Sequence, residues 1–277
     1  MKINSTRVHA IAAAALSCSC ALAQSPASPR QADEPLYITV SARAWLGAWS
    51  TWDARQPADV CGSLPQCTLA GTSESAESSS QHAIVIPALS LRRGAWLLSG
   101  SYAAAPRYAF ELRDRFYTGK RSEWDLAVGY YFAPSAAVTL GWKSILQNFE
   151  GPDDNYRYRG LTLGFAGSAR ITAGASLYGN AAIGVPGLFR AQLAEQTRDA
   201  LGQRDFDQSY YVTEIGLAYP LDLGGPGSLK GLVASVGYRS QVASIKQFRI
   251  GRDGGTSFPT TLQDNTHGLV FGLSATF

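Results

Sequence analysis

The chain has 277 residues, 45% of them hydrophobic, and its 24 basic residues nearly balance its 21 acidic ones. This balance argues against nucleic acid as a partner, which would need a clustered basic surface. The mean hydropathy is −0.06, and no stretch beyond the N-terminus approaches the ~18 uninterrupted apolar residues of a membrane helix. If the protein crosses a membrane, we expect it to do so as a β-barrel, in which only alternate residues face lipid.

Residues 1–23 have the pattern of a secretory signal peptide. Lys2 and Arg7 supply the charged start, an apolar stretch follows, and Ala21-Leu-Ala23 fits a cleavage site. Residues 24–35 are rich in Ser, Pro, Ala and charge, which predicts a disordered lead-in on the periplasmic side. The sequence therefore predicts an exported protein.

The cysteines fit an exported chain. Cys18 and Cys20 lie inside the predicted signal, where a lipoprotein signal is the alternative, although the residues before them fit that motif poorly. Cys61 and Cys67 share a polar stretch, residues 53–80, that has no periodicity. We expect these two to form a disulfide that pins the loop. Two thiols are too few ligands for a metal site, and no cofactor is predicted.

Ten segments alternate apolar with polar or small residues, which is the pattern of β-strands with one apolar face. In the clearest of them, Trp124, Leu126 and Val128 lie on one face, and Glu123 and Asp125 on the other. The expected strands cover residues 36–47, 82–91, 95–102, 123–132, 138–143, 156–167, 173–184, 209–219, 229–243 and 268–277.

The connections between these strands alternate in length. Long ones begin near residues 53, 104, 150, 185 and 244, and short ones near 92, 133, 168 and 221. An up-and-down barrel with both ends in the periplasm needs an even strand number, short periplasmic turns and long outer loops. We therefore predict an all-β, antiparallel up-and-down transmembrane β-barrel of about ten strands, within a range of eight to twelve, over residues 36–277. The charged residues 105–121 are either an outer loop or an extension of the barrel wall.

Trp45, Trp49 and Trp52 gather at the far end of the first predicted strand. Tryptophan favours the headgroup level of a membrane, because one end of its ring system is apolar and the other polar. The cluster predicts a membrane interface, and a Trp-rich soluble core is the alternative.

The faces opposite the apolar ones carry charges that would point into the lumen. Charges shielded from water must be paired. The sequence therefore predicts an ion-pair network across the barrel, which either holds it shut or lines a narrow path for small polar solutes. Its expected members are Arg43, Glu123, Asp125, Lys143, Glu214 and Arg239.

The last predicted strand carries a resemblance to a known class. Leu269, Phe271, Leu273 and Phe277 share one face, and the chain stops on that aromatic. This strand resembles the closing strand of Gram-negative outer-membrane β-barrels and their signal for the barrel-assembly machinery, although Ala275 stands where a bulkier residue is usual. The resemblance implies an outer-membrane location, with periplasmic chaperones as partners during biogenesis and membrane lipid and lipopolysaccharide afterwards.

Three functions are compatible with such a barrel. The favoured one is surface interaction or envelope structure through the extracellular loops, and the second is a narrow channel. The third is an outer-membrane hydrolase, since surface proteases and lipid-A-modifying barrels are similar in plan. Its candidate residues are His267, Asp264, Asp205 and Asp207, but the Asp-x-His and His-x-Ser pairs of those families are absent.

Overall fold

This computed structural model describes residues 34–55, 73–78, 82–104, 107–112, 115–150, 156–172, 174–193, 205–221, 229–251 and 257–277. The predicted signal peptide, all but the last two residues of the predicted lead-in, and the cysteines Cys61 and Cys67 lie outside this part of the chain.

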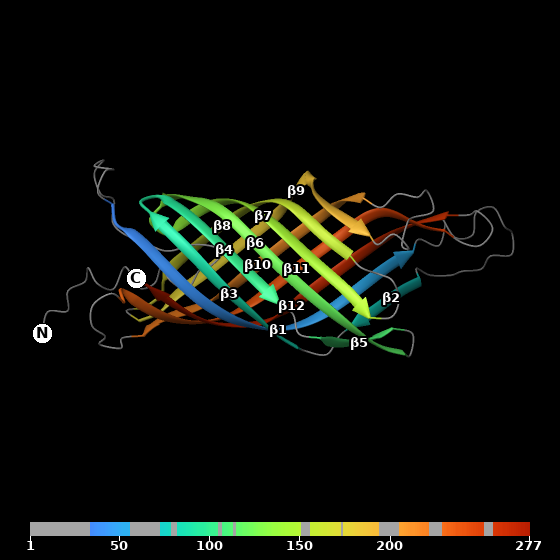
Figure 1. The fold of residues 1–277 in the computed structure, drawn as a ribbon, viewed down its shortest axis with the longest axis horizontal. Helices are drawn as coiled ribbons and strands as arrows, with labels where there is room; N and C mark the ends of the chain where they lie inside the picture. The colour runs from blue at the N-terminus through green and yellow to red at the C-terminus, as the bar shows by residue number, and fades with distance from the viewer. Residues whose placement is uncertain are drawn as a thin grey trace, which may run out of the picture.

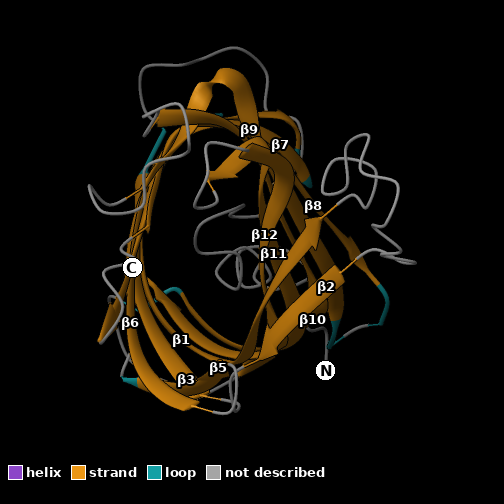
Figure 2. Cartoon of the chain, turned by 90° about the vertical axis from the view of Figure 1, so that its right-hand side faces the viewer, coloured by secondary structure: helices purple, strands orange, loops and turns teal. Residues whose placement is uncertain are grey.

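The described residues form an antiparallel barrel (Figures 1 and 2). Ten of the described strands close the ring, in which β12 pairs with β1, while β2 extends the sheet beside β1 and β5 pairs with β6. No helix within the described ranges is long and apolar enough to cross a membrane. The strands are β1 (Leu36–Arg55), β2 (Ser73–Ser78), β3 (His82–Arg93), β4 (Trp96–Ala104), β5 (Tyr108–Leu112), β6 (Arg115–Ala133), β7 (Ala136–Glu150), β8 (Tyr156–Arg170), β9 (Ser176–Leu193), β10 (Asp205–Leu221), β11 (Gly231–Gly251) and β12 (Ser257–Thr276).

The outer surface of the barrel is an apolar belt. Large hydrophobic side chains are exposed at alternate positions, as Leu126 and Val128 are on β6 and Leu140 is on β7. Aromatic side chains border the belt on both sides: Tyr102, Trp124 and Tyr211 on one, and Trp96, Tyr130, Phe132, Phe165, Tyr219 and Phe277 on the other. Such surface would be unfavourable in water, whereas a closed barrel with aromatic girdles matches a bilayer. The protein is an integral outer-membrane β-barrel.

The chain direction orients the barrel in the membrane. β1 begins and β12 ends at the same end as the tight turns after Arg93 and Ala133, on the left of Figure 1. Because short turns face the periplasm in such barrels, this end is periplasmic. The opposite end, which carries β2 and β5, is extracellular.

The predicted fold class and the ten predicted strands are confirmed. Most strands are longer than predicted, because they continue beyond their predicted extracellular ends, as β11 does to Gly251. Within residues 105–121, the described parts form β5 and the start of β6, which extend the wall. Within residues 53–80, the described parts are the end of β1 and β2, so the predicted loop is wrong for these two segments, and the rest of it lies outside the described residues. The length alternation is weaker than predicted, since the outer connections 151–155 and 252–256 are no longer than the periplasmic connection 171–175.

The prediction that the tryptophans of β1 mark a membrane interface is wrong for Trp45 and Trp49. Both are buried inside the barrel, with 1% and 3% of their surface exposed. They share the inward face of β1 with Arg43, and the alternation of the strand overrides the interfacial preference of the side chain. The side chain of Trp52 lies outside the description.

Candidate functional site: a charge network across the lumen

Inward faces of six strands bring charged side chains together in the middle of the lumen. Within the described part of the chain, the network contains four basic and four acidic residues, so its formal charge is zero. These are Arg43 of β1, Arg121, Glu123 and Asp125 of β6, Lys143 of β7, Glu214 of β10, Arg239 of β11 and Asp264 of β12.

Glu214 is the centre of one half of the network. Its Oε2 lies 3.1 Å from Nη1 of Arg43 and 3.3 Å from Nη1 of Arg239. The hydroxyl of Tyr178 donates a hydrogen bond of 3.2 Å to Oε1. The carboxylate is buried, and these three donors replace the water it has lost.

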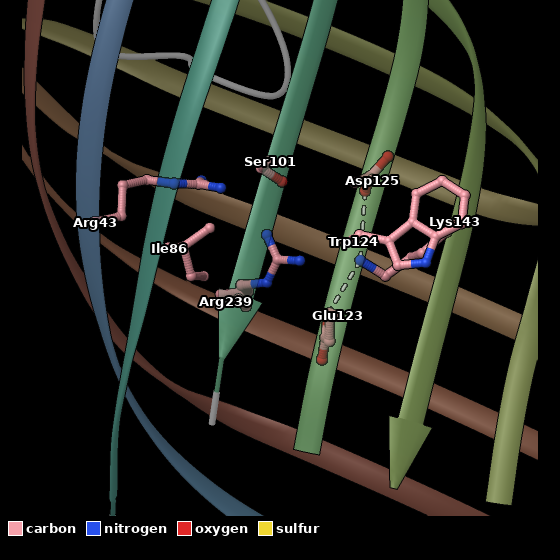
Figure 3. A pocket seen from close by; sticks show the side chains of 9 residues that line it. Arg43, Ile86, Ser101, Glu123, Trp124, Asp125, Lys143 and Arg239 are labelled. Carbon is pink, nitrogen blue, oxygen red and sulfur yellow. Dashed lines mark hydrogen bonds and ion pairs between the residues drawn. The ribbon is translucent and has the colours of Figure 1, made fainter. Parts of the chain in front are cut away.

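Glu123 is the centre of the other half. Its Oε1 lies 2.7 Å from Nε of Arg121, and its Oε2 lies 3.1 Å from Nζ of Lys143. The same ammonium group lies 3.3 Å from Oδ2 of Asp125, so Lys143 bridges the two carboxylates of β6 (Figure 3). The alternation of β6 places Glu123 and Asp125 on one face, which makes this bridge possible.

Asp264 extends the network toward the extracellular side. Its Oδ1 accepts a hydrogen bond of 2.9 Å from the indole Nε1 of Trp49 and lies 3.4 Å from Nη1 of Arg121. The same Nη1 donates to Thr266 at 3.1 Å and to Gln147 at 3.2 Å. The indole of Trp49 therefore has a polar partner inside the barrel, which is consistent with its burial.

Gln241 joins the two halves. Its Oε1 accepts from Nη2 of Arg239 at 3.4 Å, and its Nε2 donates to Oε1 of Glu123 at 3.2 Å. In the ring order, four strands separate β11 from β6 in either direction, so these two strands face each other across the barrel. The contact between Gln241 and Glu123 therefore spans the lumen at its full width.

A small cavity of about 20 Å³ lies within the network (Figure 3). Its lining includes Arg43, Lys143 and Arg239 together with Glu123 and Asp125. The buried Nε atoms of Arg43 and Arg239 have no hydrogen-bond partner among the protein atoms. A space of this size has room for about one water molecule.

An apolar cluster lines the inner face of β7 to β11 on the extracellular side of the network. The ring of Phe189 stacks on that of Tyr210, with centroids 4.6 Å apart and planes at 15°. Side chains still alternate in the parts of the strands that lie above the membrane. These residues therefore point inward, although the outward residues there are no longer mainly apolar. The cluster contains Ile145, Tyr158, Phe189, Ala191, Phe206, Tyr210, Val212, Ala243 and Ile245.

All six charges that the sequence placed in the lumen lie in this network. Two further members, Arg121 and Asp264, were not predicted there. Arg121 lies in residues 105–121, for which the sequence allowed either an outer loop or an extension of the barrel wall. Its position nevertheless continues the alternation of Glu123 and Asp125. Asp264 fell in the predicted loop of residues 244–266, of which residues 257–266 belong to β12.

The candidate catalytic residues are not brought together. Asp264 faces the lumen, whereas His267 lies on the outer face of β12, where its ring is 6.3 Å from that of the exposed Tyr238. Asp207 lies outward near the start of β10, with its side chain 75% exposed and 3.8 Å from Arg190. Asp205 begins β10, and its side chain lies outside the description. In the described ranges, no group of three or more His, Cys, Asp or Glu residues could hold a metal ion.

The assembly-signal residues occupy the outer face of β12. Leu269, Phe271, Leu273 and Phe277 are all exposed to the lipid side. At the periplasmic end, the amide of Phe277 donates to the carbonyl of Ile38 at 2.8 Å, so the last residue takes part in the seam between β12 and β1.

No family model matches this sequence, and no curated protein matches it. Among solved structures, the outer membrane protease OmpT of Escherichia coli is similar with 9% identity and a TM-score of 0.49, covering 91% of this chain and 99% of that one. A FadL homologue of Pseudomonas aeruginosa is similar with 8% identity and a TM-score of 0.32, covering 100% and 98%. The translocator domain of the autotransporter NalP of Neisseria meningitidis is similar with 10% identity and a TM-score of 0.35, covering 84% and 88%. Similarities at this level carry no argument about function.

Proposed function

We propose that this protein is a closed outer-membrane barrel that acts through its extracellular side and does not pass solutes through its lumen. The observation that carries the proposal is the contact between Gln241 and Glu123 across the full width of the barrel. A second crossing, from Arg121 of β6 to Asp264 of β12, supports it.

The energetics of the network favour the closed state. Opening a path would separate buried partners such as Glu214 and Arg43, and an unpaired buried charge costs several kcal/mol. The network has no excess charge that would attract an ion of either sign. A water-sized cavity among its members is too small to be a solute path.

The extracellular extensions of the strands supply the surface through which the barrel would act. β1 continues to Arg55 and β11 to Gly251, well beyond the aromatic residues of the outer girdle. A rigid wall that projects from the membrane positions the connections at its rim, and such connections commonly carry binding functions on stable scaffolds. We infer a surface-interaction or envelope-structural role.

Single-channel recording of the purified protein in planar bilayers tests the proposal. The wild type is expected to show no steady openings. The double variant R121A/Q241A removes both crossings of the lumen and is expected to conduct. Its matched control is Q192A, because Gln192 lies on β9 outside the network.

Steady openings of the wild type would contradict the proposal and favour the narrow channel for small polar solutes. Hydrolysis is not part of the proposal, because Asp264 and His267 lie on opposite faces of the barrel wall.

A further inference from the structure

The outer surface of β8 and β9 carries exposed arginines at the extracellular edge of the apolar belt. Arg157 and Arg159 lie on β8, and Arg190 lies on β9. Arg159 is in register with Ser144 of β7, which is itself in register with Trp124 of the outer girdle. This register places Arg159 beside the outer aromatic girdle, which marks the headgroup region in such barrels.

These arginines repel one another. Arg159 stands directly opposite Arg190 across the two strands, and like charges in that position destabilise a sheet. The counter-charge is Asp207, whose Oδ1 lies 3.8 Å from Nε of Arg190, with both side chains more than half exposed. Among the side chains that the structure describes on this face, one carboxylate stands against three guanidinium groups, which leaves an excess of positive charge.

Directly on the membrane side of Arg190, β9 leaves the regular sheet. Its pairing with β8 jumps from Phe189 to Gly184, and its pairing with β10 is interrupted at the same place, so the ribbon arches outward beside the β9 label in Figure 2. Gly187 there has a φ of 75°, and a side chain on Gly160 would collide with the carbonyl of Leu188. Leu188 is 54% exposed at this arch.

We propose that this face of β8 and β9 binds a phosphorylated glycolipid of the outer leaflet. Arg157, Arg159 and Arg190 would hold its phosphoryl group, since guanidinium groups bind phosphate through paired hydrogen bonds. The acyl chains would lie against Leu188 and the exposed Leu163 below it. A bound phosphate would also relieve the repulsion between Arg159 and Arg190. This site does not depend on whether the lumen conducts.

The test is a titration of the purified full chain in neutral detergent, followed by native mass spectrometry. The probes are bisphosphorylated lipid A and the same lipid with its phosphates removed. The wild type is expected to bind the phosphorylated lipid at least about tenfold more tightly, because charge-assisted contacts to phosphate are the strong ones. The variant R157Q/R159Q/R190Q is expected to lose this preference.

The matched control is R170Q, because Arg170 is an exposed arginine at the periplasmic end of the same strand. It is expected to bind like the wild type. Equal binding of the two lipids by the wild type, or an equal loss in R170Q, would overturn the proposal. Displacement of the lipid by an equal concentration of inorganic phosphate would overturn the lipid assignment.

A folding defect would be recognised in the same preparation. Without lipid, R159Q is expected to withstand heat at least as well as the wild type, because it removes one of two opposed like charges. Added phosphorylated lipid is expected to raise the unfolding temperature of the wild type more than that of R159Q. The opposite order would contradict the site.

Discussion

At the scale of single residues, Glu123 holds several members of the network together. It contacts Arg121, Lys143 and Gln241 within 3.2 Å, and its side chain is 8% exposed. An exposed ion pair adds about 0–1 kcal/mol to stability, because water solvates both partners well. Removal of one member of a buried pair costs more, since the other charge stays buried without its partner.

We predict that E123Q lowers the free energy of unfolding by about 3 kcal/mol or more, because Arg121 and Lys143 lose a shared counter-charge. Urea titration of the protein in lipid vesicles, followed by tryptophan fluorescence, measures the change. The control is D207N, which removes a carboxylate with 75% exposure and is expected to change stability by less than about 1 kcal/mol. Equal effects of the two substitutions would show that the network does not stabilise the barrel.

The charge balance of the network leads to a second prediction for single residues. E123Q/K143M removes one charge of each sign, so the network is neutral again. We expect the double variant to be at least about 1 kcal/mol more stable than the sum of the two single changes, because residues that share an ion pair are not independent. The same urea titration gives the coupling energy. A double variant whose loss of stability equals the sum of the two single losses would contradict the prediction.

The sequence could predict which residues face the lumen but not which of them meet. Arg43, Glu123 and Glu214 were identified from alternation alone, because side-chain direction is a local property of a strand. The partnership of Arg43 with Glu214 depends on how ten strands are staggered around the ring, which no local pattern contains. Trp49 was misplaced because the interfacial preference of tryptophan was followed instead of the alternation that Trp49 shares with Arg43. Its partner Asp264, to which the indole donates, is 215 residues away in sequence.

At the scale of elements, the seam between β1 and β12 requires close approach of two backbones. Gly47 and Gly268 face each other in the register of this pair. A Cβ atom on Gly268 would collide with the carbonyl of Leu46. By contrast, a Cβ atom on Gly100 of β4 would meet its nearest neighbour, the carbonyl oxygen of Asp125, at an ordinary 3.7 Å.

We predict that G268A weakens the barrel by about 1–3 kcal/mol, the usual cost of forcing an extra methyl group into a packed site. G100A is the matched control and is expected to be nearly neutral. The temperature at which the unboiled protein loses its folded mobility on a detergent gel compares the two. The same temperature for G268A and the wild type would show that the seam can adjust.

The elements also show where alternation loses its information. Within the membrane the outer face is apolar and contrasts with small or polar inward residues, so the strands were located correctly. Above the membrane both faces mix residue types, as Arg157 and Arg159 lie outward while Tyr158 between them is buried. The sequence therefore predicted neither the extracellular strand ends nor the arch of β9, because no alternation of apolar residues marks them.

At the scale of the whole molecule, Phe277 has two separable roles. Its backbone closes the ring, since its amide donates to Ile38 at 2.8 Å and its carbonyl accepts from the amide of Ile38 at 3.3 Å. Its side chain is 41% exposed in the periplasmic girdle and makes no such bond. The resemblance of this strand to an assembly signal concerns the side chain.

We therefore predict that F277A lowers the amount of barrel assembled in cells several-fold, while the purified, refolded protein loses less than about 2 kcal/mol of stability. A substitution to Ala keeps the backbone bonds of the seam and removes lipid-exposed apolar surface.

The matched control is F165A, because Phe165 is a phenylalanine of the same girdle on β8 with 51% exposure. Its loss of lipid contact is similar, but it lies outside the closing strand. The folded and unfolded bands of the outer-membrane fraction, run with and without boiling, give the assembled amount, and equal losses in both variants would mean that Phe277 acts through lipid contact alone.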